Sequence, residues 1–216
     1  MRGNALPKVL VVGAAACLLA AACVFFQIYG PSPAVAAAVS EPAPAYAANG
    51  DMLPVSNYRE WIYLSSGLGM TYSPQPGGMT MFDNVFVNPE AYRSFVTTGT
   101  WPDKTVMVLE SREANDKGSI NQGGHYQGTG IMGFAVHVKD EARFPGKWAF
   151  FSFNSPSGNG KLIPQGAACY TCHAVHGAVD TTFVQFYPTL LPIAHDKKTL
   201  SDAFLKDEAA HAGPSE

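Results

Sequence analysis

Residues 128–139, GTGIMGFAVHVK, set the fold class of this 216-residue chain, because their apolar side chains recur with a period of two. The stretches TVMVLE (105–110) before them and WAFFSFN (148–154) after them are also rich in β-branched or aromatic residues. Glycine and Asp/Asn clusters separate the three stretches. The pattern predicts three consecutive strands in an antiparallel meander.

Strand alternation assigns the side chains of these strands to faces. Successive side chains of a strand point to opposite sides of the sheet, so Met107 and Leu109 share one face of the first strand. By the same rule Ala135 and His137 share one face of the second strand. We therefore expect these pairs to face common neighbours.

The stretch before the first strand is expected to hold a short helix and then a loop. Asn57 suits the start of a helix over residues 57–62, with Glu60 at the capping-box position. Residues 66–84 contain many Gly, Pro and Met residues and are predicted to form a loop.

A second helix is predicted from NPE at residues 88–90, where Asn caps, Pro occupies the first turn and Glu suits the positive end of the helix dipole. Its apolar stripe consists of Tyr92, Phe95 and Val96. Gly99 suits the left-handed residue that ends a helix.

The chain after the strands is predicted to be helical. A short helix or turn carries residues 169–173, and Asp180 caps a helix over residues 181–191 that Pro188 interrupts. The residues from His195 onward are polar. The fold class is therefore α+β: an antiparallel sheet with flanking helices and a C-terminal CxxCH segment.

The first residues are typical of an export signal. A basic start is followed by an uncharged run from Val9 to Phe26 and by the small residues 34–36, AVA. Residues 1–36 are predicted to be a signal peptide or, if uncleaved, an N-terminal membrane anchor. Either way we expect the globular part to be periplasmic.

Composition then divides the rest of the chain. Residues 37–54 are an Ala/Pro-rich linker, residues 55–194 a single domain with one core, and residues 195–216 a polar tail. The net charge is −3, which gives no reason to expect nucleic acid or an anionic membrane surface as a partner.

CYTCH, residues 169–173, is the motif of covalent haem attachment. Cys169 and Cys172 lie on one face of a helical turn and can each add to one vinyl group of haem, while His173 can ligate the iron. The motif predicts one covalently bound haem c. A zinc site, a redox-active dithiol, a disulfide and a chance match are the alternatives, but no second CxxC is present and the other two cysteines, Cys17 and Cys23, lie in the leader.

Several motifs together resemble the cytochrome P460 family, over roughly residues 55–192. They are NYREW (57–61), VNPEAY (87–92), TGTWPDKTV (98–106), KWAF (147–150), CYTCH (169–173) and FYP (186–188). The resemblance implies a β-rich fold that binds c-type haem on an otherwise five-coordinate iron, often as a homodimer. Enzymatic members of the family oxidise hydroxylamine, and the related cytochromes c′-β bind nitric oxide or carbon monoxide.

Two positions depart from the enzymatic members. Those carry a lysine cross-linked to haem in a stretch like TVxVKE, and here Leu109 takes the place of that lysine. They also carry a glutamate on the distal side, opposite the axial histidine, in a stretch like GxExxVKD, and here Ala135 takes its place. Lys104 is not a substitute, because alternation points it to the other face. With Met107, these residues predict an apolar distal pocket, although plain core packing explains Met107 equally well.

His137 could replace the missing base, since it lies two residues beyond Ala135 on the same face. The alternative is a surface or sheet-edge histidine that is hydrogen-bonded to the backbone. A sixth ligand from the protein is also conceivable. Candidates in loops are His125, Met70, Met79 and Met81, whereas His176 follows His173 too closely to reach the other side of haem.

Three functions follow as hypotheses. The first is a five-coordinate haem c protein that binds nitric oxide or a similar small ligand. The second is a hydroxylamine oxidoreductase without the cross-link. The third is a six-coordinate electron-transfer cytochrome. A redox partner protein fits the second and third.

Overall fold

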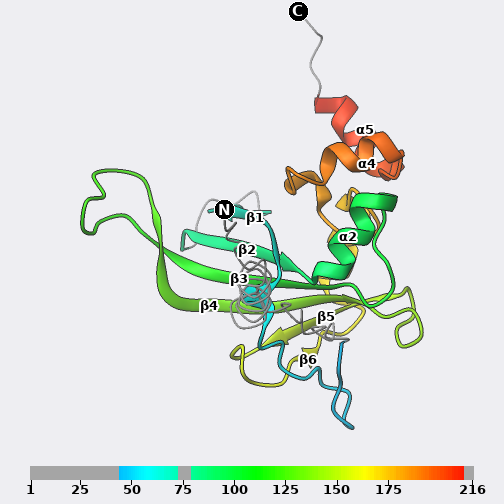
Figure 1. Cartoon of the computed structure of the whole chain (residues 1–216), viewed down its shortest axis with the longest axis horizontal. Coiled ribbons are helices and arrows are strands. Elements are labelled where there is room, and N and C mark those ends of the chain that lie inside the picture. The colour runs from blue at the N-terminus through cyan, green and yellow to red at the C-terminus, as the bar shows by residue number, and fades with distance from the viewer. Residues whose placement is uncertain (1–43, 73–78, 212–216) are drawn as a thin grey trace, which may run out of the picture. The chain divides into compact units, whose positions relative to one another are not determined.

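The computed structural model describes residues 44–72 and 79–211, which form a six-stranded antiparallel sheet with helices packed against it (Figure 1). The strands lie in the sheet in their order along the chain, so the predicted α+β class and the antiparallel meander are confirmed. The elements are η1 (Tyr58–Glu60), β1 (Ile62–Leu68), β2 (Met81–Val87), α2 (Pro89–Thr98), β3 (Val106–Asn115), β4 (Tyr126–Lys139), β5 (Trp148–Phe153), β6 (Lys161–Leu162), α3 (Ala168–His176), η2 (Val184–Phe186), α4 (Leu191–Lys197) and α5 (Asp202–His211).

The register of the sheet arranges one of its faces into three rows of side chains. The first row is Val87, Met107, His137 and Phe150; the second row is Ser65, Val85, Leu109, Ala135 and Ser152; the third row is Gly67, Asp83, Ser111 and Gly133. Neighbouring rows are two residues, or about 7 Å, apart along the strands. The predicted pairs of side chains do share a face, with Met107 opposite His137 and Leu109 opposite Ala135.

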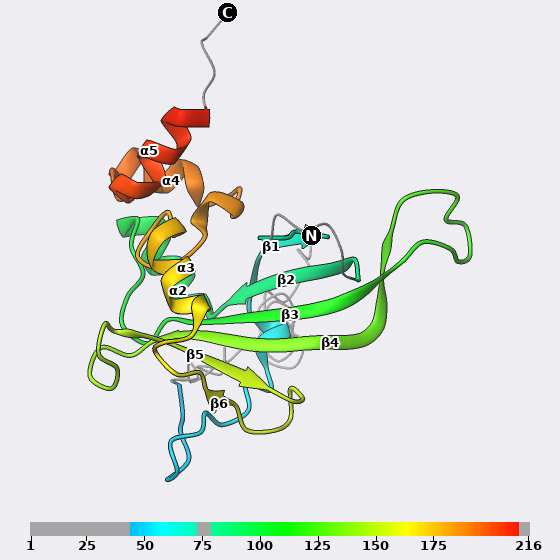
Figure 2. The same ribbon diagram turned by 180° about the vertical axis from the view of Figure 1, so that it is seen from behind.

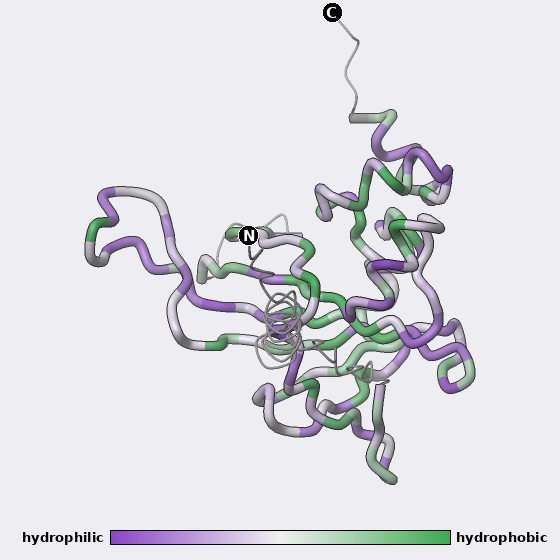
Figure 3. Tube along the Cα trace, in the orientation of Figure 1, coloured by the Kyte–Doolittle hydropathy of each residue, from purple (hydrophilic) through white to green (hydrophobic). Residues whose placement is uncertain are grey.

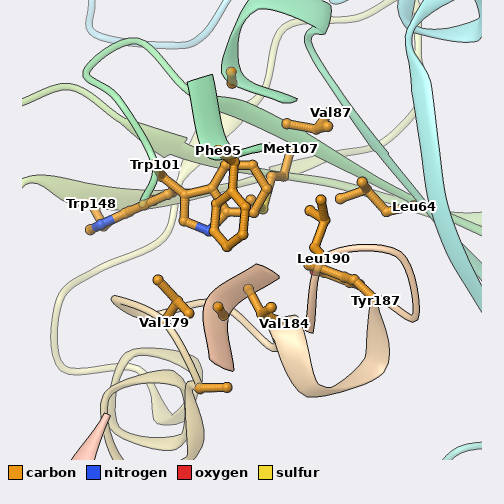
Figure 4. Close-up of a cluster of buried hydrophobic side chains, with 13 residues drawn as sticks. Leu64, Val87, Phe95, Trp101, Met107, Trp148, Val179, Val184, Tyr187 and Leu190 are labelled. Carbon is orange, nitrogen blue, oxygen red and sulfur yellow. The ribbon is translucent and has the colours of Figure 1, made fainter. Parts of the chain in front are cut away.

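Val87 and Met107 of the first row belong to a hydrophobic core that joins the sheet to the helices (Figure 4). Phe95 of α2 is fully buried, and its ring centroid lies 4.3 Å from that of Trp101. The indole nitrogen of Trp101 donates a hydrogen bond of 2.8 Å to the hydroxyl of Thr182. This core fixes the segment after α3 against the end of the sheet that carries the first row.

A second core covers the opposite face of the sheet. It contains the alternate strand residues, among them Val108, Val136 and Phe151, and the buried Met52 and Trp61 of the N-terminal segment. The Met52 amide donates to the Gly160 carbonyl, and the Met52 carbonyl accepts from the Gly160 amide, so part of the segment predicted as a linker contacts the sheet. The leader, residues 1–36, lies outside the described residues, and within the described ones no helix is long and apolar enough to cross a membrane.

The prediction of a loop over residues 66–84 was wrong, because both ends of this range belong to strands. Ile62–Leu68 and Met81–Val87 pair with each other, and the second of them also pairs with β3. MFDNVFV carries a period of two with Phe82 and Phe86 on one face. The Gly, Ser and Met residues around it masked that signal.

The predicted α2 is confirmed, but its capping is not as expected. Gly99 ends the helix in the left-handed conformation, with φ 77°. The Asn88 side chain makes no cap hydrogen bond; it accepts from the Val106 amide instead, at 2.8 Å. Of the predicted stripe, Phe95 is buried, whereas Val96 is 40% exposed.

Two further predictions of helices were wrong. Residues 57–62 form only the 3-10 turn η1, in which Asn57 makes no side-chain cap. The helix predicted over residues 181–191 is reduced to the single turn η2, and α4 begins only at Leu191. Asp180 has φ 53° and does not cap a helix; its carboxylate accepts from Lys139 Nζ instead, at 3.3 Å.

Glu110 is a buried charge in the second core, 1% exposed, with three partners: Tyr58, Arg59 and Arg112. Burial raises its pKa, but the hydrogen bonds from Arg112 and Tyr58 and the charges of both arginines outweigh burial, so the pKa lies below its ordinary value of 4.5. The carboxylate therefore stabilises the fold above pH 4.5, and this contribution is lost as the pH falls through the lower folded-state pKa.

We expect Glu110→Gln to lower the free energy of unfolding by about 1.5–3 kcal/mol at neutral pH, because charged hydrogen bonds are lost. The variant should also lose part of the acid dependence of stability below pH 4.5. Urea titrations of the haem-loaded protein at several pH values measure both effects. Glu60→Gln, at an exposed position of η1, is the control. Equal acid slopes for the two variants would contradict the assignment.

Candidate functional site

A cavity of about 290 Å³ lies between the three rows of the sheet, helix α3 and residues 182–187. Seven of the candidate site residues proposed from the sequence line it: Met70, Met107, Leu109, Ala135, His137, Cys169 and His173. Cys172 follows Cys169 by about one turn of α3 and is half-buried, and both thiols are free. The sequence therefore located most of one wall of this cavity.

Helix α3 is fixed against β5 by Tyr170, and the view from behind shows α3 on the same side of the sheet as α2 (Figure 2). The Tyr170 hydroxyl accepts from the Phe150 amide at 3.1 Å and donates to the Ile163 carbonyl at 3.0 Å. The two rings also meet edge to face, 4.8 Å apart. Tyr170, the first variable residue of CYTCH, thereby sets where the cysteines and the histidine lie relative to the sheet.

His173 has a defined tautomer. Its Nδ1 lies 2.7 Å from the Thr181 carbonyl oxygen, which can only accept, so Nδ1 carries the proton. Burial lowers the pKa of His173, and the hydrogen bond to Thr181 opposes this shift only in part. The lowered pKa favours the neutral ring. The Phe183 ring stacks on it at 4.1 Å. The remaining ring nitrogen, Nε2, is free to bind a metal in the orientation that Thr181 imposes.

His137 lies beside His173 and is buried. The two ring centroids are 5.1 Å apart, and the His137 ring stacks on Phe150 at 4.0 Å. Its Nε2 is 3.2 Å from the hydroxyl of Thr181, whose carbonyl orients His173. Burial and then the neighbouring His173 hold the pKa of His137 well below its ordinary value. His137 is thus neither at the surface nor bonded to backbone, and it occupies the side of the cavity that holds His173.

Asp83 is a charged cavity residue that sequence reasoning missed, because it fell in the predicted loop. It lines the cavity from the third row, and the Ser111 hydroxyl donates to its Oδ1 at 2.5 Å. Tyr72 also lines the cavity, and its pKa is raised by burial and then by the charge of Asp83. The cavity is therefore mostly apolar but holds a carboxylate. The period of two in MFDNVFV was the signal that would have placed it.

Of the loop residues considered as sixth ligands, Met70 lines the cavity. Met79 is 62% exposed, and Met81 belongs to β2 opposite Glu113. His125 is exposed near the hairpin end between β3 and β4. Over residues 44–72 and 79–211, no group of three or more His, Cys, Asp or Glu side chains could together hold a metal ion.

The family model of cytochrome P460 matches residues 55–184, which include β1 to β5 and the CYTCH segment. The chain belongs to the cytochrome P460 family. It is accordingly a haem protein, and the predicted family is confirmed. No curated protein matches the chain.

The site of this cytochrome P460 member fits haem. The cavity is lined largely by apolar side chains, as a porphyrin requires, and His173 presents one neutral imidazole to it. A cysteine, Cys169, lies on the same wall. Leu109 and Ala135 both face the cavity from the second row, so neither a lysine nor a glutamate is present at those two places.

Proposed function

We propose that this protein is an exported c-type cytochrome that binds nitric oxide or a similar small ligand at a five-coordinate haem iron. Two features of the cavity together carry the proposal. His173 offers one oriented imidazole, and the side chains of Leu109 and Ala135 in the second row cannot bind a metal. Haem supplies the iron that takes up the ligand.

Covalent attachment of a single haem is part of the proposal. Cys169 lines the cavity, and Cys172 follows it on α3, four backbone positions before the helix ends at His176. Both thiols are free to form thioether bonds. His173 is the next residue after Cys172, so the cysteines and the axial ligand belong to one rigid helix.

The apolar middle of the second row, formed by Val85, Leu109 and Ala135, supports a neutral, weakly hydrogen-bonding ligand. Leu109 is 38% exposed, in agreement with a side chain that faces an open cavity. Leu109, Ala135 and Val85 provide no donor that could polarise a bound diatomic molecule. Nitric oxide binds ferrous haem without such a donor.

A six-coordinate electron-transfer cytochrome is the second candidate, and Met70 favours it. A side chain built on Gly67 would meet the Met70 sulfur at 2.3 Å, so Met70 packs directly over the third row and lines the cavity. A thioether at that place could bind the iron opposite His173.

The absorption spectrum of the haem-loaded protein, ferric and dithionite-reduced, tests these alternatives. We expect a high-spin ferrous spectrum that changes on addition of nitric oxide. A low-spin histidine–methionine spectrum with no response to nitric oxide would replace the first proposal by the second, and Met70→Ala should then restore the response. A ferrous band shifted far to the red would indicate a modified haem. Turnover of hydroxylamine with an artificial electron acceptor would then become the leading function.

We also propose a periplasmic location, a homodimeric state and, for redox turnover, a partner protein. The location follows from the export signal and from haem c, which bacteria attach outside the cytoplasm. Cell fractionation with haem staining tests the location. Light scattering of the purified protein tests the oligomeric state.

A further inference from the structure

We propose that His137 is a positioning residue for the axial ligand His173, and that it acts through Thr181. The inference rests on the c-type haem site proposed above and adds a residue that sets the strength of the axial bond. The sequence suggested His137 as a base, but its contacts lie with the axial histidine instead.

Thr181 links the two histidines. Its carbonyl oxygen accepts from Nδ1 of His173 at 2.7 Å. Its hydroxyl lies within hydrogen-bond distance of Nε2 of His137, at 3.2 Å. One residue thus binds one histidine with its backbone and the other with its side chain. A shift of the Thr181 side chain therefore changes the distance and angle at which the carbonyl meets His173.

The turn that carries Thr181 depends on contacts from other elements. Asp180, the residue before it, has a left-handed backbone with φ 53°, which is strained for a residue other than glycine. The Asp180 carboxylate accepts from Lys139 Nζ at 3.3 Å, which holds the turn on that side. His137 supplies a contact from the sheet to Thr181 itself.

His137 is itself held in a fixed orientation. Its ring stacks on Phe150 at 4.0 Å with an angle of 12° between the planes, and lies 4.4 Å from the Trp148 ring. It is buried in the first row between Met107 and Phe150. A buried polar ring costs free energy unless it is hydrogen-bonded, and a phenylalanine would fill the same space without that cost. The contact with Thr181 is thus what a histidine adds here.

This contact acts on the basicity of the axial imidazole. A metal-bound histidine becomes a stronger ligand when its other ring nitrogen donates to a well-placed acceptor, and the loss of such a partner typically costs about 10–100-fold in metal affinity. The rotation of the His173 ring is limited separately, because Phe183 stacks on it and Phe150 meets its edge. We therefore expect His137 to set the strength of the axial bond, while the aromatic rings keep the ligand in place.

The midpoint potential and the iron–histidine stretching band of the ferrous haem-loaded protein test the proposal. Thr181→Val removes the hydroxyl and keeps the carbonyl. We expect a higher potential and a lower stretching frequency, because a less basic imidazole favours ferrous iron. His137→Phe keeps the stacked ring and should cause the same shifts. Thr181→Ser keeps the hydroxyl and should behave as the wild type.

Thr105→Val is the matched control. Thr105 is buried, its hydroxyl donates to the Pro102 carbonyl at 2.7 Å, and it does not line the cavity. The variant loses one hydroxyl hydrogen bond, as Thr181→Val does, and should leave the potential and the stretching band unchanged. The double variant of His137→Phe and Thr181→Val should shift no further than the more affected single variant, because both changes remove the same contact.

The outcomes separate this proposal from the proposed function. Additive shifts, or a shift in His137→Phe without one in Thr181→Val, would mean that His137 acts by packing alone and would overturn its role. No shift in either variant would overturn it too and leave the haem site standing. A low-spin wild-type spectrum would overturn the five-coordinate state, and the potential would still decide the role of His137. A wild type that takes up no haem would overturn both.

Discussion

The double variant Cys169→Ala, Cys172→Ala is expected to contain no covalently bound haem. The two thiols are free and lie on the helix whose His173 faces the cavity. Without thioether bonds, haem is held by His173 and apolar contacts alone, and denaturation releases it. Haem staining of a denaturing gel and the intact mass measure the loss. Each single variant keeps one possible thioether and should show reduced staining.

The control for this experiment is Cys23→Ala, because Cys23 lies in the predicted leader and outside the described residues. It should stain as strongly as the wild type. Haem that stayed attached in the double variant after denaturation would mean a bond from another residue, which is the situation in family members with a cross-linking lysine. That result would contradict the assignment of Leu109 to the lysine position.

Trp101→Ala is expected to lower the free energy of unfolding by about 3–5 kcal/mol, because the variant leaves a large cavity in the first core. Trp101 is 2% exposed, packs on Phe95 and donates to Thr182. For a chain of this size the change corresponds to a fall in melting temperature of roughly 6–20 °C. Urea and thermal unfolding of the haem-loaded protein measure it.

Ile120→Ala is the matched control for a large apolar side chain. Ile120 is 91% exposed at the end of the β3–β4 hairpin, where most of the chain is hydrophilic or neutral (Figure 3). We expect a change within about 0.5 kcal/mol. A loss at Trp101 as small as that at Ile120 would show that the first core does not determine the stability of the protein.

The strands that could be predicted from the sequence are those whose alternation is undisturbed. In β3, β4 and β5, β-branched and aromatic residues recur with a period of two, so both the strands and their faces were right at Met107 and Ala135. In β1 the residues Ser65 to Gly67 are small and polar, and they form a strand only because β2 pairs with them. Pairing with another strand leaves little signal in the sequence of the strand itself.

The same distinction holds for the site. CYTCH is contiguous, so Cys169, Cys172 and His173 could be identified together. The partners of His173 could not, because the Thr181 carbonyl and the His137 ring reach it through loop and sheet geometry. Asp83 required the register of a strand that was not recognised. Contacts that depend on tertiary structure were thus the ones that sequence patterns missed.

A single layer of strands separates the cavity on one face of the sheet from the second core on the other. This arrangement limits where residues can be inserted or deleted. In β3, Leu109 faces the cavity while the next residue, Glu110, lies in the opposite core with Arg59 and Arg112. A one-codon insertion or deletion before position 109 would exchange the two, burying a charge beside haem. Beyond Ser111 the β3–β4 register already shifts by bulges, so the hairpin end can absorb added codons. Length variation among relatives should therefore accumulate between residues 112 and 131, and an epitope tag inserted there should leave haem binding intact.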